Sequence, residues 1–213
     1  MRSYPPEPWH LRGEFLAGIF LVPTSELPAY VWAQIPSAAR PLALGGRAIV
    51  AVAAVRYTPG GVLEYDELLV AVPTIQRRRL ALTIPQIWVT SPASRAGGRA
   101  LWGIPKELMT TRRAAAGRRL RVRHRAEDRA VLAELDGAAT IDLPGTWTLP
   151  LPTLQRRPGG GVIRSSNSVR GRMHLARTAW TFGSSLSWLG GRRPALSAAL
   201  TGAAIVFGTR VER

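Results

Sequence analysis

Short apolar runs bounded by glycine and proline are the feature that most limits what this chain can fold into. Residues 13–22, 47–57 and 63–72 are aliphatic-rich, and runs of this length between turn residues indicate β-strands. The TPGG segment at 58–61 predicts a hairpin between the second and third runs. Further strands are expected at residues 118–125, 129–135, 138–143, 161–169 and 173–182. The sequence therefore predicts a mainly β fold with small helical additions (α+β), arranged as an antiparallel barrel or sandwich.

Three other segments bear on the organisation of the chain. Residues 24–32 predict a short helix with Thr24 as its N-cap, although Pro28 opposes helix formation there. Residues 194–208 fit a strand or a helix, and 156–161 (RRPGGG) is the best linker candidate. Because 213 residues suffice for one large core and little chain follows the linker, we expect a single domain over residues 1–213.

The segment 118–125 (RRLRVRHR) alternates arginines with Leu120, Val122 and His124. A period of two is typical of a half-buried strand. Glu134 and Asp136, in the next expected strand, can pair with the arginine row. We favour a solvated sheet face over an anion-binding face.

The charge of the chain raises the possibility of nucleic-acid binding. Twenty-nine basic residues against 13 acidic ones give a formal charge of +16, and clustered cations bind phosphate backbones. The arginines, however, recur from Arg2 to Arg213 with no basic arm beside a helix-turn-helix pattern. Nucleic-acid binding therefore stays a third hypothesis that we do not favour.

Other classes find little support in the composition. The chain has no cysteine, and its three histidines have no metal-ligand spacing, so we expect no metal. The N-terminus lacks the apolar core of a secretory signal, and the apolar tail at 195–208 is too short to span a bilayer. We expect a cytoplasmic protein that does not enter a membrane.

One position differs from all the other basic residues: Lys106 is the only lysine in the sequence, so the other 28 basic residues are arginines. A deprotonated lysine amine can condense with a carbonyl, whereas a guanidinium stays charged and unreactive. Lys106 follows a glycine-rich stretch with Trp102 and Pro105 as apolar cover, and burial disfavours the ammonium form of a lysine. The simpler interpretation is an ordinary surface lysine; the alternative is a former of Schiff bases.

The residues around Lys106 carry a resemblance that favours the second interpretation. The string GGRALWGIPKEL, with YPPEPWHLRGEFLAGIFLVP and LEYDELLVAV before it, resembles the acetoacetate decarboxylase family, whose lysine lies in a segment G-R-E-x-x-x-x-P-K-K. Gly98, Arg99, Pro105 and Lys106 match that segment in identity and spacing. The resemblance covers about residues 4–109. It implies a closed antiparallel β-barrel around a reactive lysine, in a homo-oligomer.

The same resemblance implies roles for individual residues. Lys106 would be the nucleophile that forms an imine with a keto acid, with no cofactor. Glu67, two residues after a tyrosine as in the family, would orient groups or move protons. Arg12, near the first strand, is the candidate for holding the substrate carboxylate. Trp102 and Arg99 beside the lysine are further candidates for substrate binding. Glu67 and Arg12 could equally be solvated surface residues.

The sequence departs from the family pattern at two positions. Glu107 stands where the family has a second lysine, and a carboxylate beside Lys106 would favour its ammonium form. Val52 stands where our alignment places a second family acid. The favoured function is a Schiff-base enzyme, either a decarboxylase or a related aldolase or dehydratase. The alternative is a non-catalytic barrel that binds a small ligand.

Overall fold

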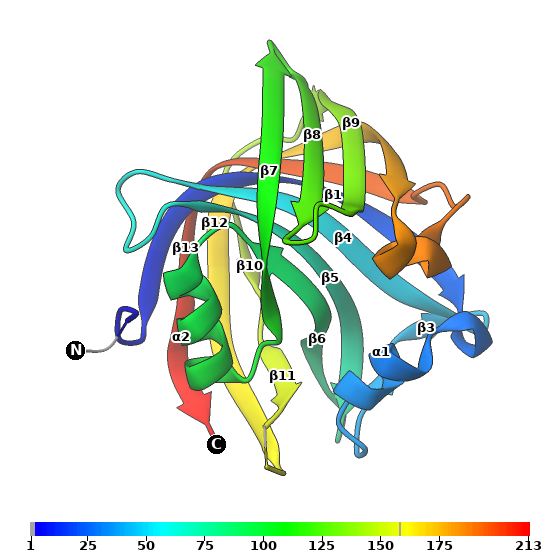
Figure 1. The fold of residues 1–213 in the computed structure, drawn as a ribbon, viewed down its shortest axis with the longest axis vertical. Helices are drawn as coiled ribbons and strands as arrows, with labels where there is room; N and C mark the ends of the chain where they lie inside the picture. Colours follow the sequence, from blue (N-terminus) through cyan, green and yellow to red (C-terminus); the bar gives the residue numbers. More distant parts are fainter. Residues whose placement is uncertain (1–2, 158) are drawn as a thin grey trace.

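The computed structural model describes residues 3–157 and 159–213, in which one thirteen-stranded sheet bends around three buried apolar clusters (Figure 1). Arg2 and Pro158, which belong to the arginine series and to the predicted linker, lie outside the described residues. No helix within the described ranges is long and apolar enough to cross a membrane.

The first half of the chain contains β1 (Trp9–Pro23), η1 (Thr24–Glu26), α1 (Ala29–Gln34), β2 (Arg40–Pro41), β3 (Ala43–Leu44), β4 (Arg47–Thr58), β5 (Tyr65–Gln76), β6 (Arg79–Val89) and α2 (Pro92–Trp102). The second half contains β7 (Lys106–Ala116), β8 (Arg119–Ala126), β9 (Val131–Asp142), β10 (Trp147–Pro150), β11 (Thr153–Arg156), β12 (Val162–Phe182), η2 (Ser184–Leu189) and β13 (Leu196–Glu212).

The prediction of a mainly β fold with small helical additions is confirmed. β4 and β5 pair antiparallel across the predicted TPGG hairpin. The expected strands at 129–135 and 138–143 are one strand, β9, because Gly137 continues the pairing with β8 and β12. Two other expected strands merge in the same way into β12, and residues 194–208 are largely strand rather than helix. Strand existence was therefore easier to predict than strand ends.

The prediction of a purely antiparallel sheet is wrong at two pairings. β6 pairs parallel with β7, and β11 pairs parallel with β6. The first follows from α2, since a helix between two neighbouring strands carries the chain back to the starting edge. The helix α2 was not predicted from the sequence, although its two ends carry recognisable signals. At its start, the Ser91 side chain accepts a hydrogen bond from the Ser94 backbone N–H, and Pro92 occupies the first helical position. At its end lies Gly103 in a left-handed conformation.

The helix expected at 24–32 is divided. Thr24 begins a short 3-10 helix without a side-chain cap, and α1 begins only after Pro28. The arginine row on β8 is confirmed as a solvated face. Arg119 and Arg121 bind Asp136, and Arg123 binds Glu134, with all three arginine side chains about half exposed or more.

Both faces of the central strands are buried, and this arrangement separates the two larger of the three clusters. One face of β4 and β5 packs with α1 and η2 around Phe20, Val52 and Leu68. The other face packs beneath α2 with Trp9 and Trp102. Residues that alternate along β5 therefore enter different cores, and Asp66 and Glu67 lie on opposite faces.

Candidate active site

Lys106 is the first residue of β7, placed there by the crossover through α2. Its backbone lies in register with Ile87 of β6, and the hydrogen bond from its backbone N–H to the Ile104 carbonyl tightens the turn before it. The residue is only 4% exposed. The one lysine of the sequence is therefore a core residue, and its interpretation as an ordinary surface lysine is wrong.

The side chain of Lys106 runs under α2, across Gly98. A Cβ atom added at Gly98 would lie 2.7 Å from Lys106 Cδ and 2.8 Å from Cε, closer than non-bonded carbons approach. The preceding Gly97 similarly accommodates the ring of Trp9. The absence of side chains at Gly97 and Gly98 thus allows α2 to pack directly against Trp9 and Lys106.

Three polar groups meet the Lys106 amine. Nζ donates to Glu67 Oε2 at 2.8 Å, to Ser94 Oγ at 3.0 Å and to Tyr65 OH at 3.4 Å. Glu67 is 3% exposed and Ser94 is fully buried. An ammonium has three donors, and here each has an acceptor. The geometry fits a buried ion pair from which Glu67 can accept a proton.

Two tyrosines also donate hydrogen bonds to the Glu67 carboxylate. Tyr57 OH donates to Oε1 at 3.2 Å and Tyr65 OH donates to Oε2 at 3.4 Å, and the two rings lie 4.4 Å apart. Burial raises the pKa of both phenols well above 10, and the negative charge of Glu67 raises it further. Both hydroxyls therefore stay protonated near neutral pH and act as donors.

Glu107 does not contact the Lys106 amine. Side chains alternate along a strand, so Glu107 points to solvent, where its half-exposed carboxylate pairs with Arg99. Arg99 also donates from Nε to the Lys106 carbonyl oxygen at 2.7 Å. The sequence led us to expect the Glu107 carboxylate beside the Lys106 amine. This expectation is wrong, because the carboxylate beside the amine is Glu67.

The other predicted site residues lie apart from the amine. Trp102 is 2% exposed and packs edge-on against Trp9 and Phe207. Arg12 is exposed on β1, with its side chain beside the Gly60 turn. The structure thus brings together Lys106 and Glu67 among the predicted residues. It leaves Arg12 on the surface, Arg99 against the backbone of Lys106 rather than its amine, and Trp102 in the core.

Val52 also lies away from the site. It packs in the core with Phe20 and Leu68, on the face of β4 opposite Tyr57. A carboxylate at this position would not face Glu67. The position that sequence alignment assigned to the second family acid is consequently not a site position in this fold.

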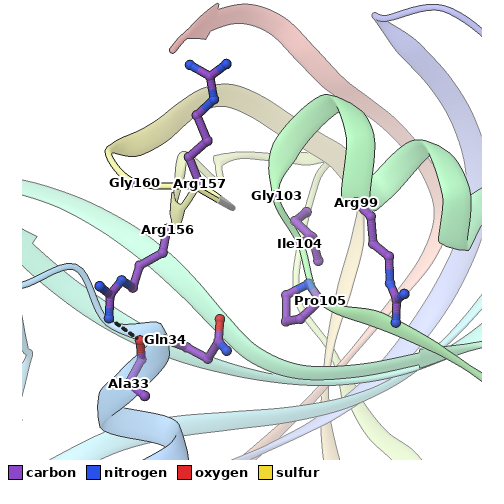
Figure 2. A pocket seen from close by; sticks show the side chains of 10 residues that line it. Ala33, Gln34, Arg99, Gly103, Ile104, Pro105, Arg156, Arg157 and Gly160 are labelled. Atoms are coloured by element: carbon purple, nitrogen blue, oxygen red, sulfur yellow. Dashed lines mark hydrogen bonds between the residues drawn. The ribbon is translucent and has the colours of Figure 1, made fainter.

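A hollow of about 500 Å³ lies on the outer side of the segment that leads to Lys106. Figure 2 shows Ile104 and Pro105 on one wall, Gln34 and Arg156 opposite, and Arg99 beyond. Arg156 donates to the Ala33 carbonyl near the end of α1. Lys106 is not among the residues that line this hollow.

Sequence reasoning missed Ser94 and Tyr57 as contacts of the site. Ser94 could have been found from the helix-start signal at Ser91 and Pro92, which places it in the first turn of α2. Tyr57 carries no local signal, since only the pairing of β4 with β5 sets it opposite Tyr65. Within the described residues, no group of three or more His, Asp and Glu side chains could hold a metal ion.

Comparison with known proteins agrees with this geometry. The family model described as acetoacetate decarboxylase (ADC) matches residues 27–189, well over half of the chain. The chain belongs to the acetoacetate decarboxylase family. The resemblance inferred from the sequence is confirmed, and in this member of the family the lysine and the upstream glutamate are in contact. No curated protein matches the sequence.

Solved structures show the same fold at low identity. The enduracididine biosynthesis enzyme MppR, complexed with the condensation product of pyruvate and imidazole 4-carboxaldehyde, is 16% identical with a TM-score of 0.70, over 99% of this chain and 90% of that one. Acetoacetate decarboxylase from Legionella pneumophila is 14% identical with a TM-score of 0.69, over 97% of this chain and 87% of that one. The family fold therefore extends over almost the whole decarboxylase-like chain.

Proposed function

We propose that this protein is a cofactor-free Schiff-base enzyme in which Lys106 forms an imine with a keto acid. The observation that carries the proposal is the contact of 2.8 Å between the buried Lys106 Nζ and Glu67 Oε2. A nucleophilic amine needs a base within hydrogen-bond reach, and this base is oriented by a third group, Tyr57. Membership of the decarboxylase family supports the same chemistry.

The first steps follow from the contacts of the amine. Glu67 accepts a proton from the Lys106 ammonium, and the free Nζ adds to the ketone carbon to give a carbinolamine. The carbinolamine loses water, with its hydroxyl taking a proton from Glu67, and a protonated imine forms. Ser94 Oγ and the tyrosine hydroxyls would stabilise the charges that develop.

The protonated imine is an electron sink, and two outcomes are open to it. With a β-keto acid, the bond to the carboxylate breaks, CO₂ leaves and the electron pair forms an enamine, which is protonated and hydrolysed to the ketone. With pyruvate, loss of a methyl proton gives an enamine that can add to an aldehyde. The MppR structure with a pyruvate condensation product makes this aldolase or dehydratase chemistry a real option. We propose carbon–carbon lyase chemistry of one of these kinds.

The alternative is a non-catalytic member of the fold that binds a small ligand. The observation in its favour is that the amine already has three acceptors, so that the pair resembles a satisfied structural ion pair. In that case a ligand would bind without forming a covalent bond to Lys106.

The closure of the sheet, the domain organisation, the assembly, the location and the substrate contacts belong to the same proposal. The pairing of β6 with both β5 and β7 supports closure of the sheet into a barrel around the lysine. We propose that residues 1–213 form one domain and that it acts as a homo-oligomer in the cytoplasm. Arg12, Trp102 and Arg99 remain candidate substrate contacts, although their present positions would need to change for them to touch a ligand on Nζ.

Borohydride trapping tests the proposal directly, because Lys106 and the N-terminal amine are the only primary amines in this sequence. The protein is incubated with acetoacetate or pyruvate, reduced, and measured by intact-mass and peptide mass spectrometry. We expect an adduct on Lys106. An isopropyl adduct from acetoacetate indicates decarboxylation before reduction, and an adduct that keeps the carboxylate indicates imine formation alone.

The control is Lys106→Arg, which keeps the charge and reports any background at the N-terminus. Absence of an adduct on Lys106 with either keto acid, or full turnover in the arginine variant, would overturn the Schiff-base proposal. Ligand binding without an adduct would support the non-catalytic alternative.

A further inference from the structure

The sheet forks on the side away from α2. β12 pairs with β13 as far as Leu175 opposite Ala198. From Ala176 to Phe182 its pairing continues only with β9. In the described part of the chain, this stretch of β12 therefore has a strand on one side and none on the other. Unpaired backbone N–H and C=O groups along such an edge are free to accept another strand.

A groove of about 920 Å³ lies along this fork. Its walls are the unpaired stretch of β12 and the segment that leads into β13, residues 191–197, with Ile141 of β9 at the rim. A hydrogen bond of 2.6 Å between Thr178 Oγ1 and Ser197 Oγ joins the two walls where the fork begins. Figure 1 shows the end of β12 and η2 on the opposite side of the sheet from α2.

The charged residues that line the groove are all positive. Arg177, Arg192 and Arg193 line it, and its lining contains no aspartate or glutamate. Arg192 binds Glu26. Neither Arg177 nor Arg193 forms an ion pair with any carboxylate in residues 3–157 or 159–213, and both are exposed. Two uncompensated cations therefore face whatever occupies the groove.

Apolar side chains complete the surface. Ile141 is 58% exposed and Leu196 is 53% exposed, and both line the groove. Trp180 also lines it and is held by a hydrogen bond to Thr178 and by stacking on Phe182. Exposed aliphatic residues that share a groove with a held aromatic ring are typical of interaction surfaces rather than of a solvated rim.

We propose that this groove binds an extended acidic peptide segment of a partner protein, which adds as a strand to β12 along residues 176–182 and displaces the hydrogen bond between Thr178 and Ser197. Main-chain hydrogen bonds to a free edge supply affinity, and the side chains beside the edge set the specificity. Alternating carboxylates would meet Arg177 and Arg193, and alternating apolar residues would meet Leu196 and Trp180. A second copy of this chain suits the groove less well, since 13 acidic residues against 29 basic ones leave it few carboxylates to meet Arg177 and Arg193, and a homo-oligomer would form through other surfaces.

The test uses the full chain and a fluorescein-labelled hexapeptide in which glutamate and valine alternate. Fluorescence polarisation at about 0.15 M salt measures its affinity, and hydrogen–deuterium exchange locates it. We expect saturable binding and slower exchange at residues 176–182. A peptide with lysine in place of glutamate should bind at least about tenfold more weakly because its charges meet the arginines. A glutamate peptide with proline in place of the central valine should also bind more weakly, because proline cannot complete the strand ladder.

A matched pair of variants separates the groove from the general positive charge. Arg177→Ser with Arg193→Ser should weaken binding by about tenfold. Arg170→Ser with Arg172→Ser removes two exposed arginines from the part of β12 that β13 covers, and should leave affinity unchanged. The proposal is overturned if both double variants lose affinity equally, if the proline peptide binds as well as the parent, or if exchange slows elsewhere and not at 176–182. Lys106→Arg should bind the peptide like the parent protein.

Discussion

Lys106 Nζ and Glu67 Oε2 are separated by 39 positions in the sequence and by 2.8 Å in the structure. Both side chains are almost completely buried, so the pair is shielded from the solvent that weakens surface ion pairs. The β6–α2–β7 crossover delivers the lysine to this place, and β5 supplies the glutamate.

Glu67→Gln should slow imine formation in the protein that remains folded. The amide is similar in size and can still accept from Tyr57, but it cannot take a proton from Lys106. Loss of a general base costs about 10²–10⁴-fold in rate. Rates of borohydride trapping with pyruvate and of CO₂ release from acetoacetate measure the effect, with far-UV circular dichroism as the folding control. An unchanged trapping rate in a folded variant would remove Glu67 from the proton-transfer role.

The buried pair should show strong coupling in stability. Removal of one partner leaves an uncompensated buried charge, which costs about 3–5 kcal/mol, whereas replacement of both is far better tolerated. Urea unfolding of Lys106→Met, of Glu67→Gln and of the double variant gives the coupling free energy. We expect the double variant to be more stable than the sum of the single changes predicts, by more than about 1 kcal/mol. Simple additivity would mean that the two groups do not interact.

Gly98→Ala should reduce the reactivity of the Lys106 amine more than it reduces the stability of the fold. The new Cβ would displace Lys106 Cδ and Cε, whereas alanine is favoured over glycine in a helix by about 1 kcal/mol. We expect a small change in unfolding free energy and about a tenfold or larger loss of trapping rate, since misplaced reacting groups lose orientation. The matched control is Gly97→Ala, whose Cβ would meet the Trp9 ring at 2.4 Å and should reduce stability instead. The prediction fails if the two variants behave alike.

His124 should make the stability fall in mild acid. Burial, with a smaller contribution from the Arg113 charge, lowers its pKa from 6.5 to about 4. The unfolded chain therefore binds a proton at a higher pH than the folded protein does. Stability from this residue is fully present above pH 6.5 and is lost as pH falls toward 4, by about 3 kcal/mol in total. Urea unfolding between pH 7 and pH 4 measures the slope.

The control for His124 is a variant that does not titrate. His124→Gln can still bond Thr111, the partner of Nδ1 in the parent protein, and should show a flatter dependence over the same range. Equal slopes in the two proteins would assign the acid sensitivity to other groups.

Much of the fold could be predicted from local pattern. The aliphatic runs of β1, β4 and β5 lie between turn residues, and the alternation of β8 predicted its exposed arginine face, because a strand has a period of two whatever its partners are. The crossover helix was harder to predict. Its apolar pattern is weakened by Gly97 and Gly98, which serve packing against Trp9 and Lys106 rather than helix propensity.

Only part of the candidate site could be predicted from the sequence. Lys106 and Glu67 could be named from residue chemistry and family spacing. Arg12, Trp102 and Arg99 were also named, yet their side chains lie on the surface, in the core and against the lysine backbone. Proximity in sequence says little about which face of a strand or helix a side chain occupies, and Lys106 and Glu107 demonstrate this most directly.

The sequence by itself determined that one residue of this chain could form an imine, because among its cationic side chains only a lysine amine can lose its proton and attack a carbonyl. It also determined where most strands would form. Only the tertiary structure decided that the carboxylate beside the amine is Glu67 and not Glu107. The physical reason is that alternation sends neighbouring side chains to opposite faces, while long-range pairing of β4, β5, β6 and β7 brings distant ones together.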